Sequence, residues 1–264
     1  MSVDKIPGLL LRVGIDKGTG GCRAPIFQDG SFEYIPIPEI CATSESDVYE
    51  SMKGRCGESL AAFVKESYWY SHPHHDPEFT TYTYGDPARN KRNRLSELQH
   101  PGGILIFYAG LEPKGWEPED WASKSRLFVI GYFTIEQVYD FKAKPQARWK
   151  ETFNEVPNNA HSKIYNRLKA LNVEYRDDNL VIVKGCPKNS ILFPKALPLG
   201  DDNNCPLESV RCVIGYEKSL LRAVGHRIDK NHIQKVKKWL QKWLEQSNAR
   251  DNKTKNIGAE ESLF

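Results

Sequence analysis

Runs of apolar residues separated by polar stretches punctuate the 264-residue chain, and four of these runs predict β-strands. The clearest are "PGGILIFYAGL" at 101–111 and "RLFVIGYFTIEQVYDF" at 126–141. "LLLRVGID" at 9–16 and "DNLVIVKGCP" at 178–187 have the same character, and a glycine turn follows the first of them. Short apolar runs bounded by turn residues are typical of buried strands. We therefore expect a β-rich core around the two longest runs.

Helical periodicity is confined to a few segments. Apolar residues fall on one face at 161–171 and again at 229–246, where Asp229 can cap the first turn. The stretch 58–69 fits a short helix, and "SFEYIPIPE" at 31–39 predicts an edge strand or extended segment because prolines interrupt it. Apolar strands with helices at their edges predict the α+β class, with a mixed β-sheet or a small β-barrel as the core.

The domain organisation follows from where this pattern ends. Regular periodicity stops near residue 246, and "SNARDNKTKNIGAEESLF" shows none. We therefore predict a single α+β domain over 1–246 and a flexible C-terminal tail over 247–264. Residues 70–100 predict a long polar loop, and loops of that length inside a compact domain are usually functional or disordered. Its four aromatic residues argue against disorder.

Composition and charge narrow the class of protein. Apolar residues make up 39% and charged residues 27% of the chain, as in globular proteins, and the apolar runs are too short to span a membrane. The six cysteines form no C-x-x-C pair, which favours reduced thiols and a cytoplasmic location. The formal net charge is +3, but Gln28–Glu58 carries 2 − 7 = −5 and Glu217–Lys255 carries 11 − 4 = +7. Such basic regions fit a polyanion such as DNA, or equally a solvated helix face.

Several segments together resemble one family. "LRVGIDKGTGGCRAPIFQDGSFEYIPIPE", "HHDPEF" and the two long apolar runs are similar to the nucleotide modification associated domain 3 family over roughly residues 9–200. The resemblance implies a role in DNA base or nucleotide modification, with other proteins of such a system as possible partners. It implies no defined catalytic set. "GGILIFYAGL" followed by "FVIGYFTIEQV" is also similar to the central strands of PUA-like folds, which bind RNA or modified bases, so the barrel alternative would be PUA-like.

The glycine-rich turn after the first strand is one candidate site. In "GIDKGTGGCRAPIF", glycines surround Thr19, and successive backbone N–H groups in such a turn can hold a phosphate or carboxylate. The turn matches neither common phosphate-loop pattern, and a plain flexible turn is the alternative. We predict ligand contacts from Thr19, Gly20 and Gly21, and a catalytic role for Asp16 at the strand end.

The segment "HPHHDPEF" at 72–79 holds three of the seven histidines. His72, His74, His75 and Asp76 are all possible metal ligands, but the usual zinc-site spacings are absent, and polar packing is an alternative. A histidine beside a carboxylate also suits acid–base catalysis, because imidazole titrates near neutral pH. We predict His75 and Asp76 as a catalytic pair and assign no metal or cofactor.

Nucleotide contacts are predicted downstream of the histidines. Tyr82 and Tyr84 could stack on a base, or both could be core residues. The basic run that follows offers phosphate contacts from Arg89, Lys91 and Arg92. His161 precedes a predicted helix, whose N-terminus attracts anions. Trp116, Trp121 and Trp149 could line a base pocket or belong to the core.

Two functions fit these residues. The first is a component of a DNA base or nucleotide modification system that binds, and possibly modifies, a nucleotide or base in one cleft shared by the glycine turn and the histidine loop. The second is a non-catalytic PUA-like reader that holds a modified base of DNA or RNA between aromatic side chains. An enzyme needs a positioned acid, base or nucleophile, whereas a reader needs only stacking and hydrogen bonds to base edges.

Overall fold

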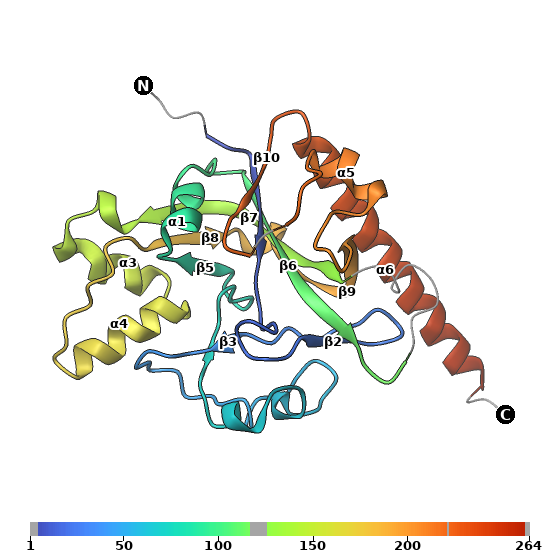
Figure 1. Ribbon diagram of the computed structural model, residues 1–264, viewed down its shortest axis with the longest axis horizontal. Coiled ribbons are helices and arrows are strands. Elements are labelled where there is room, and N and C mark those ends of the chain that lie inside the picture. Colours follow the sequence, from blue (N-terminus) through green and yellow to red (C-terminus); the bar gives the residue numbers. More distant parts are fainter. Residues whose placement is uncertain (1–4, 117–125, 221, 262–264) are drawn as a thin grey trace.

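A mixed β-sheet forms the centre of the molecule in the computed structural model, which describes residues 5–116, 126–220 and 222–261 (Figure 1). The main path of the sheet is β10-β1-β6-β7-β8-β5, while β2 pairs with β6 and β9 pairs with β7. The strands are β1 (Gly8–Arg12), β2 (Ala24–Ile26), β5 (Thr83–Asp86), β6 (Ile104–Pro113), β7 (Leu127–Asp140), β8 (Val181–Gly185), β9 (Ile191–Gly200) and β10 (His226–Ile228). A separate two-stranded sheet joins β3 (Ile37–Pro38) and β4 (Pro73–His74).

The α+β class is confirmed, and of the two cores predicted the mixed sheet is correct. β1 runs parallel to β6, whereas β6–β7, β7–β8 and β5–β8 are antiparallel. The path formed by the described strands has β10 and β5 at its two ends and is therefore not a closed barrel. β1 and the first eight residues of β6 are buried, which explains why both lie in apolar runs of the sequence, with Arg12 at the end of β1 as the charged exception.

Helices flank the sheet at opposite ends of the view in Figure 1. α3 (Trp149–Glu155) and α4 (Ala160–Ala170) lie at one end, and α5 (Glu208–Ile214) and α6 (Ile233–Glu261) lie at the other. α1 (Arg89–Ser96) lies near the sheet over β7 and β8. Single 3₁₀ turns occupy Leu60–Phe63, Glu66–Tyr68, Phe141–Ala143, Gln146–Arg148 and Pro187–Asn189. None of the described helices is long and apolar enough to cross a membrane.

Two hydrophobic clusters hold these parts together. The larger one fills the space around β1, β6 and β7 and includes Leu10, Phe107 and Phe133, all almost fully buried. The smaller one packs α3 and α4 against the ends of β7 and β8 through rings such as those of Phe141 and Phe153. Because α4 is fixed by this second cluster, its first turn has a defined position relative to the sheet.

The 70–100 region differs most from its predicted form. It contains β4, β5 and α1 rather than one long loop. β5 has the sequence "TYGD", which has no apolar periodicity, and it becomes a strand because it pairs with β8 at the sheet edge. Tertiary pairing here overrides a weak local preference. β9 is likewise a ten-residue strand, although its two prolines suggest a short, broken segment.

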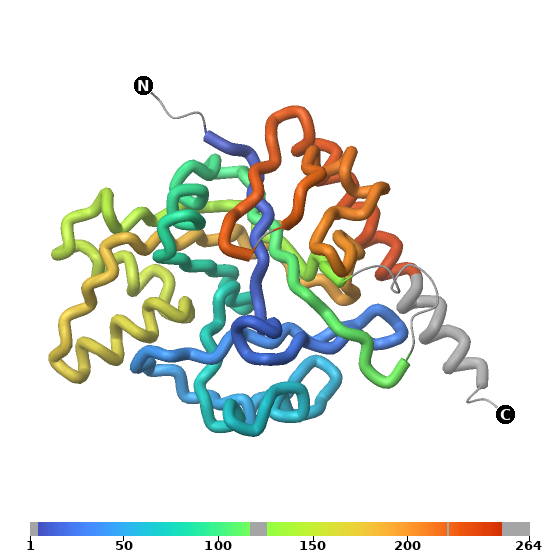
Figure 2. Tube along the Cα trace, viewed as in Figure 1, coloured from blue at the N-terminus to red at the C-terminus, as the bar shows by residue number. Residues whose placement is uncertain are grey.

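The C-terminal helix also departs from the pattern. α6 continues to Glu261, past residue 246, where the sequence predicts that regular structure ends. Close to that position, Trp243 Nε1 donates a hydrogen bond to the carbonyl of Lys195 in β9. The Ser247 hydroxyl donates to the carbonyl of Trp243 within the helix. The coloured part of this helix in Figure 2 lies against α5 and β9. The division into a domain over 1–246 and a separate tail stays a prediction.

Candidate functional site

One large pocket opens beside β3, β4, β5 and the N-terminal half of α4. Its volume is about 940 Å³, and we call it the main pocket. Its polar lining comes from five parts of the chain: the end of β1 with the turn after it, the β3–β4 pair, the β5–α1 segment, α4 with the residues around 175–179, and Arg222 before β10. The lining side chains that matter here are Arg12, Thr19, Glu39, His74, Asp76, Tyr84, Lys91, His161, Tyr175 and Arg222.

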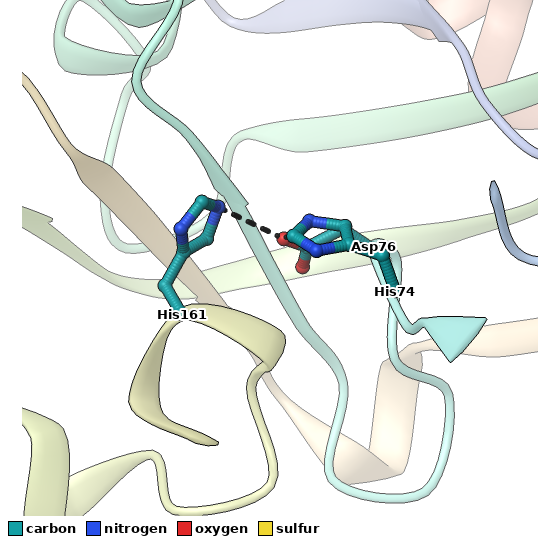
Figure 3. A group of neighbouring side chains, drawn as sticks. All are labelled: His74, Asp76 and His161. Atoms are coloured by element: carbon teal, nitrogen blue, oxygen red, sulfur yellow. Dashed lines mark hydrogen bonds and ion pairs between the residues drawn. The ribbon is translucent and has the colours of Figure 1, made fainter. Parts of the chain in front are cut away.

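Asp76 lies at the centre of a buried group that we call the histidine cluster, formed by His74, Asp76 and His161 (Figure 3). Asp76 Oδ1 accepts hydrogen bonds from the backbone N–H of Gly85 and from Asn159 Nδ2, both at 3.0 Å. These two donors fix the carboxylate so that Oδ2 faces both imidazoles. His74 Nε2 lies 3.1 Å and His161 Nε2 lies 3.2 Å from that oxygen.

His74 is held between two carboxylates. Its Nδ1 lies 2.6 Å from Glu39 Oε2, and its Nε2 lies 3.1 Å from Asp76 Oδ2. Burial opposes the charged form of the ring, but the hydrogen bonds that the ring donates to Asp76 and Glu39 outweigh it and raise the pKa of His74 to about 10. Burial likewise opposes ionisation of Asp76, yet its contacts with His161 and His74 leave the Asp76 pKa below its ordinary value. His74 is therefore an imidazolium at neutral pH, and Asp76 is a carboxylate.

His161 differs from His74 in having an unsatisfied nitrogen. It sits in the first turn of α4, where the side chain of Asn159 caps the helix by accepting from the His161 backbone N–H at 3.1 Å. Asn159 thus positions both Asp76 and His161. His161 Nε2 is buried and makes no hydrogen bond of good geometry within the described residues, although it lies close to Asp76 Oδ2. A buried nitrogen of this kind can exchange a proton or ligate a cation.

A second charged group, which we call the arginine cluster, contains Arg12, Asp16 and Arg222. Arg222 Nη1 lies 2.7 Å and Arg12 Nη2 lies 3.7 Å from Asp16 Oδ2. Arg222 also donates to the carbonyl of Gly14 at 2.8 Å. Both arginines line the main pocket, whereas Asp16 lies behind them and is not part of the lining. Each guanidinium carries five N–H donors, so donors remain for an anion in the pocket.

The glycine turn does not present a free phosphate cradle. The backbone N–H groups of Gly18 and Thr19 and the Thr19 hydroxyl all donate to Asp16 Oδ1, each at 2.9 Å. The turn therefore wraps around its own carboxylate. Gly20 packs so tightly on Ile15 that a Cβ there would lie 2.3 Å from it, and Gly21 has a positive φ of 72° beside Lys65. Of the residues predicted in this turn, Thr19 lines the main pocket.

Among the described residues, no hydrogen bond or ion pair joins His75 to Asp76, the pair predicted from the sequence. His75 Nε2 faces Glu45, at 3.9 Å from its Oε2, and Glu45 in turn binds Lys163. Burial lowers the pKa of His75 despite the nearby Glu45 charge. Consecutive residues of this segment point in different directions, so the carboxylate of Asp76 meets the imidazoles at 74 and 161 instead. The catalytic roles predicted for Asp16, His75 and Asp76 stay predictions.

The two tyrosines have different surroundings. Tyr84 lines the main pocket but is only 2% exposed, and its hydroxyl donates to Asp86 Oδ2 at 2.9 Å. Tyr82 lies outside the pocket lining and packs edge-on against Phe133 in the core. Tyr82 and Tyr84 therefore do not form a pair of exposed ring faces on which a base could stack. Stacking by Tyr82 or Tyr84 stays a prediction, and of the two only Tyr84 lines the main pocket.

The basic run forms α1, and most of its charges are paired. Lys91 lies 2.9 Å from Asp86 and lines the main pocket, while Arg92 lies 2.6 Å from Asp140 Oδ1. Arg94 lies 3.8 Å from Glu97, and Arg89 is exposed. The run is thus a partly neutralised helix face rather than an extended phosphate-binding strip.

The tryptophans contribute little to the main pocket. Trp149 is buried in the second hydrophobic cluster and donates to the carbonyl of Phe141. Trp116 packs on the larger cluster and donates to the carbonyl of Ile26. Trp121 lies outside the described residues.

The pocket residues that were not predicted include Arg12, Glu39 and Arg222. Arg12 interrupts the apolar run "LLLRVGID", and a charge inside a buried strand is a signal that could have been used. Glu39 ends the "IPIPE" segment, where it reads as an ordinary surface acid. Arg222 lies in an irregular stretch of the sequence that carries no motif.

With the geometry established, the chain can be compared with known proteins. The model of the nucleotide modification associated domain 3 family matches residues 8–255, so the chain belongs to that family. No curated protein matches the chain, and no solved structure does. The resemblance found in the sequence is therefore confirmed over nearly the whole length, while the site itself must be interpreted from its own residues.

Proposed function

We propose that this member of the nucleotide modification associated domain 3 family binds a nucleotide or a nucleic-acid base in the main pocket and modifies it there. The family's link to nucleotide modification supplies the setting. The chemistry rests on the main pocket alone, in which the histidine cluster and two arginines line the same cavity.

The observation that carries the proposal is that one cavity is lined both by groups that exchange protons and by groups with a permanent positive charge. The histidine cluster offers groups that exchange protons, and Arg12 and Arg222 offer fixed positive charge. Guanidinium groups bind phosphates through paired N–H donors. A nucleotide whose phosphate meets the arginines would present its sugar or base to other parts of the wall, including the histidines. The volume of about 940 Å³ is within the range of small-molecule sites and admits such a ligand.

The proposed chemistry begins with Asp76. Its charge is fixed by Gly85, Asn159 and His74, so Asp76 orients the imidazole of His161 and stabilises that ring when it gains a proton. The His161 imidazole, which lines the main pocket and meets Asp76 through Nε2, exchanges a proton with the ligand's reacting atom. His74 remains protonated and contributes positive charge near any anion that develops.

A reader would require a different lining. Binding a flipped base without chemistry depends on stacking against exposed ring faces. The aromatic residues of the described pocket lining are Tyr84 and Tyr175, with only 2% and 8% of their surfaces exposed. A buried histidine–carboxylate cluster is a costly feature for such a role, because unpaired buried polar groups destabilise a fold. The modification role therefore has the stronger physical basis.

The test combines cellular chemistry with direct binding. DNA and nucleotide pools from cells that lack the gene are compared by mass spectrometry with those complemented by wild type, Asp76→Asn or His75→Ala. We expect wild type and His75→Ala to restore a modified nucleoside and Asp76→Asn to lower it at least 100-fold, with each protein present at equal level. Full restoration by Asp76→Asn would remove the catalytic proposal and leave the reader. No difference between cells with and without the gene would reject both the substrate and the chemistry.

A further inference from the structure

We propose that His74 Nε2, Asp76 Oδ2 and His161 Nε2 together bind one divalent first-row transition-metal cation. This inference does not need the nucleotide, because it concerns only the chain and a metal. With the ion bound, His74 Nε2 and His161 Nε2 are ligands, so the proton-exchange roles proposed above belong to the metal-free site. It rests on the spacing of three ligand atoms, on the groups that orient them, and on the unsatisfied nitrogen of His161.

The spacing of the three atoms suits a metal. They lie within 4.8 Å of one another, with 3.1 Å from His74 Nε2 and 3.2 Å from His161 Nε2 to Asp76 Oδ2. Ligand atoms about 2.1 Å from a transition metal are about 3.0–3.4 Å apart in octahedral or tetrahedral geometry. The two contacts with Asp76 already have that separation, so a cation could enter with small side-chain movements.

The groups behind the ligands resemble those of metal centres. Histidine ligands commonly donate their second ring N–H to a carboxylate, which fixes the ring and its tautomer. His74 has this arrangement, since its Nδ1 lies 2.6 Å from Glu39 Oε2. The non-ligating oxygen of Asp76 is held by Gly85 and Asn159, which leaves Oδ2 directed at both rings.

His161 provides the independent evidence. Its side chain is 8% exposed, and Nε2 is paired with Asp76 Oδ2 at 3.2 Å, the contact dashed in Figure 3, without hydrogen-bond geometry to any described residue. Leaving a buried polar atom unsatisfied lowers the stability of a fold. A metal ion would satisfy it. At His74, the same ion would replace the proton that Nε2 shares with Asp76.

The donor set indicates the class of metal. Two imidazoles and one carboxylate suit zinc or non-haem iron, whereas magnesium and calcium prefer oxygen ligands. All three ligands also line the main pocket, so the remaining coordination positions face the cavity. Such an open site is typical of catalytic rather than structural metals.

The experiment measures metal binding to the full chain under anaerobic conditions. Metal-free protein is titrated with Co²⁺ while visible absorption is recorded, and Zn²⁺ and Fe²⁺ are then measured by competition. We expect wild type to bind one equivalent with a spectrum of nitrogen and oxygen ligands. His161→Ala and His74→Ala should weaken binding at least 100-fold, and Glu39→Gln about 10- to 100-fold because it only orients His74.

His75→Ala is the matched control. It removes a neighbouring imidazole that faces Glu45 rather than the cluster, and it should bind cobalt like wild type. His161→Gln and Asp76→Asn, which nearly keep side-chain size, replace any alanine variant whose circular dichroism shows unfolding. Three results would overturn the proposal: no binding by wild type up to millimolar Co²⁺, unchanged binding by His161→Ala or His161→Gln, or a cobalt–thiolate absorption band that locates the ion on cysteines.

Discussion

Two buried carboxylates, Asp16 and Asp76, have the same charge and different partners. Asp16 is surrounded by the turn that follows β1, and both of its oxygens are occupied by permanent donors, including Arg222 at 2.7 Å. Asp76 is held on one oxygen by Gly85 and Asn159, but its other oxygen faces two imidazoles. Guanidinium groups stay protonated at any physiological pH, whereas imidazoles exchange their protons.

This difference in partners suggests a difference in role. Both oxygens of the Asp16 carboxylate already accept hydrogen bonds or ion-pair contacts, and the residue lies behind the pocket wall. These features suit a role in positioning Arg12 and Arg222. The Asp76 carboxylate lines the pocket beside a nitrogen that has no hydrogen-bond partner in the described structure. Burial and charge alone therefore do not identify a reactive carboxylate, and the exchangeability of its partners is the better guide.

The largest expected effect is on activity at Asp76. Asp76→Asn keeps the shape of the side chain but removes the charge that orients His161, and we expect modified-nucleoside levels to fall at least 100-fold. Thermal unfolding, measured in parallel, confirms that the variant is folded. Asp16→Asn serves as the comparison and should lower activity per folded molecule less than tenfold. Equal losses in the two variants would remove the distinction between the carboxylates.

Stability, rather than activity, is the property that we expect substitution of Asp16 to change most. Asp16→Asn leaves two guanidiniums without their carboxylate, and breaking a buried ion pair typically costs about 3–5 kcal/mol. Because a quarter of the Arg222 side chain is exposed, we expect about 2–4 kcal/mol less free energy of unfolding in urea at pH 7. Asp29→Asn, at an exposed turn, is the control and should cost less than about 1 kcal/mol. A loss that small at Asp16 would contradict the structural role.

Ligand affinity should depend on the arginines. Arg222→Ala removes one of the two cations at the pocket wall, and we expect mononucleotide binding by calorimetry to weaken about 10- to 30-fold. Arg222→Lys keeps the charge but loses the paired donors, so its affinity should be intermediate. Arg227→Ala, on the exposed side of β10, is the control. Undiminished affinity in Arg222→Ala would show that the anion binds elsewhere.

The dependence of the unfolding free energy on pH in the acidic range should also reflect the ionisation of Asp16. Burial opposes its ionisation, but Arg222, Thr19 and Arg12 outweigh burial, so the pKa of Asp16 in the folded chain is below its ordinary 3.8. A lowered folded pKa stabilises the protein above 3.8, and that contribution is lost as pH falls through the folded value. The difference in unfolding free energy between wild type and Asp16→Asn should therefore be constant from pH 7 to 5 and shrink below pH 4. A constant difference down to pH 2.5 would contradict this assignment.

The smallest effect is expected at α1. Lys91 and Arg92 are already paired with Asp86 and Asp140, so few charges of this helix are free to release counterions from DNA. Changing Arg89 and Arg94 together to Ala should flatten the slope of log affinity against log salt by at most about 2. The pair Arg148→Ala and Lys150→Ala, on exposed positions near α3, is the control. A change well above 2 would restore α1 as a principal DNA contact.

Much of the fold is encoded locally. The runs at 101–111 and 126–141 predict β6 and β7, because the first eight residues of β6 and the first five of β7 are buried and therefore almost all apolar. The face of Ile164 and Leu168 predicts α4 to within a residue at each end. By contrast, β5 and β9 were not recognisable as strands of this length, since their pairing partners rather than their own residues make them strands.

The candidate site likewise has residues that the sequence identified and residues that only the structure brought into it. The sequence by itself identified the segment with His74 and Asp76, the residue His161 and the family, because these signals lie in short stretches of unusual composition. It favoured His75 as the partner of Asp76, since adjacency is the one relation that a sequence displays. Only the tertiary structure decided that His161, 85 residues away, and Glu39 complete the cluster. The direction of each side chain depends on strand pairing and helix packing, and those are set by contacts between residues far apart in the chain.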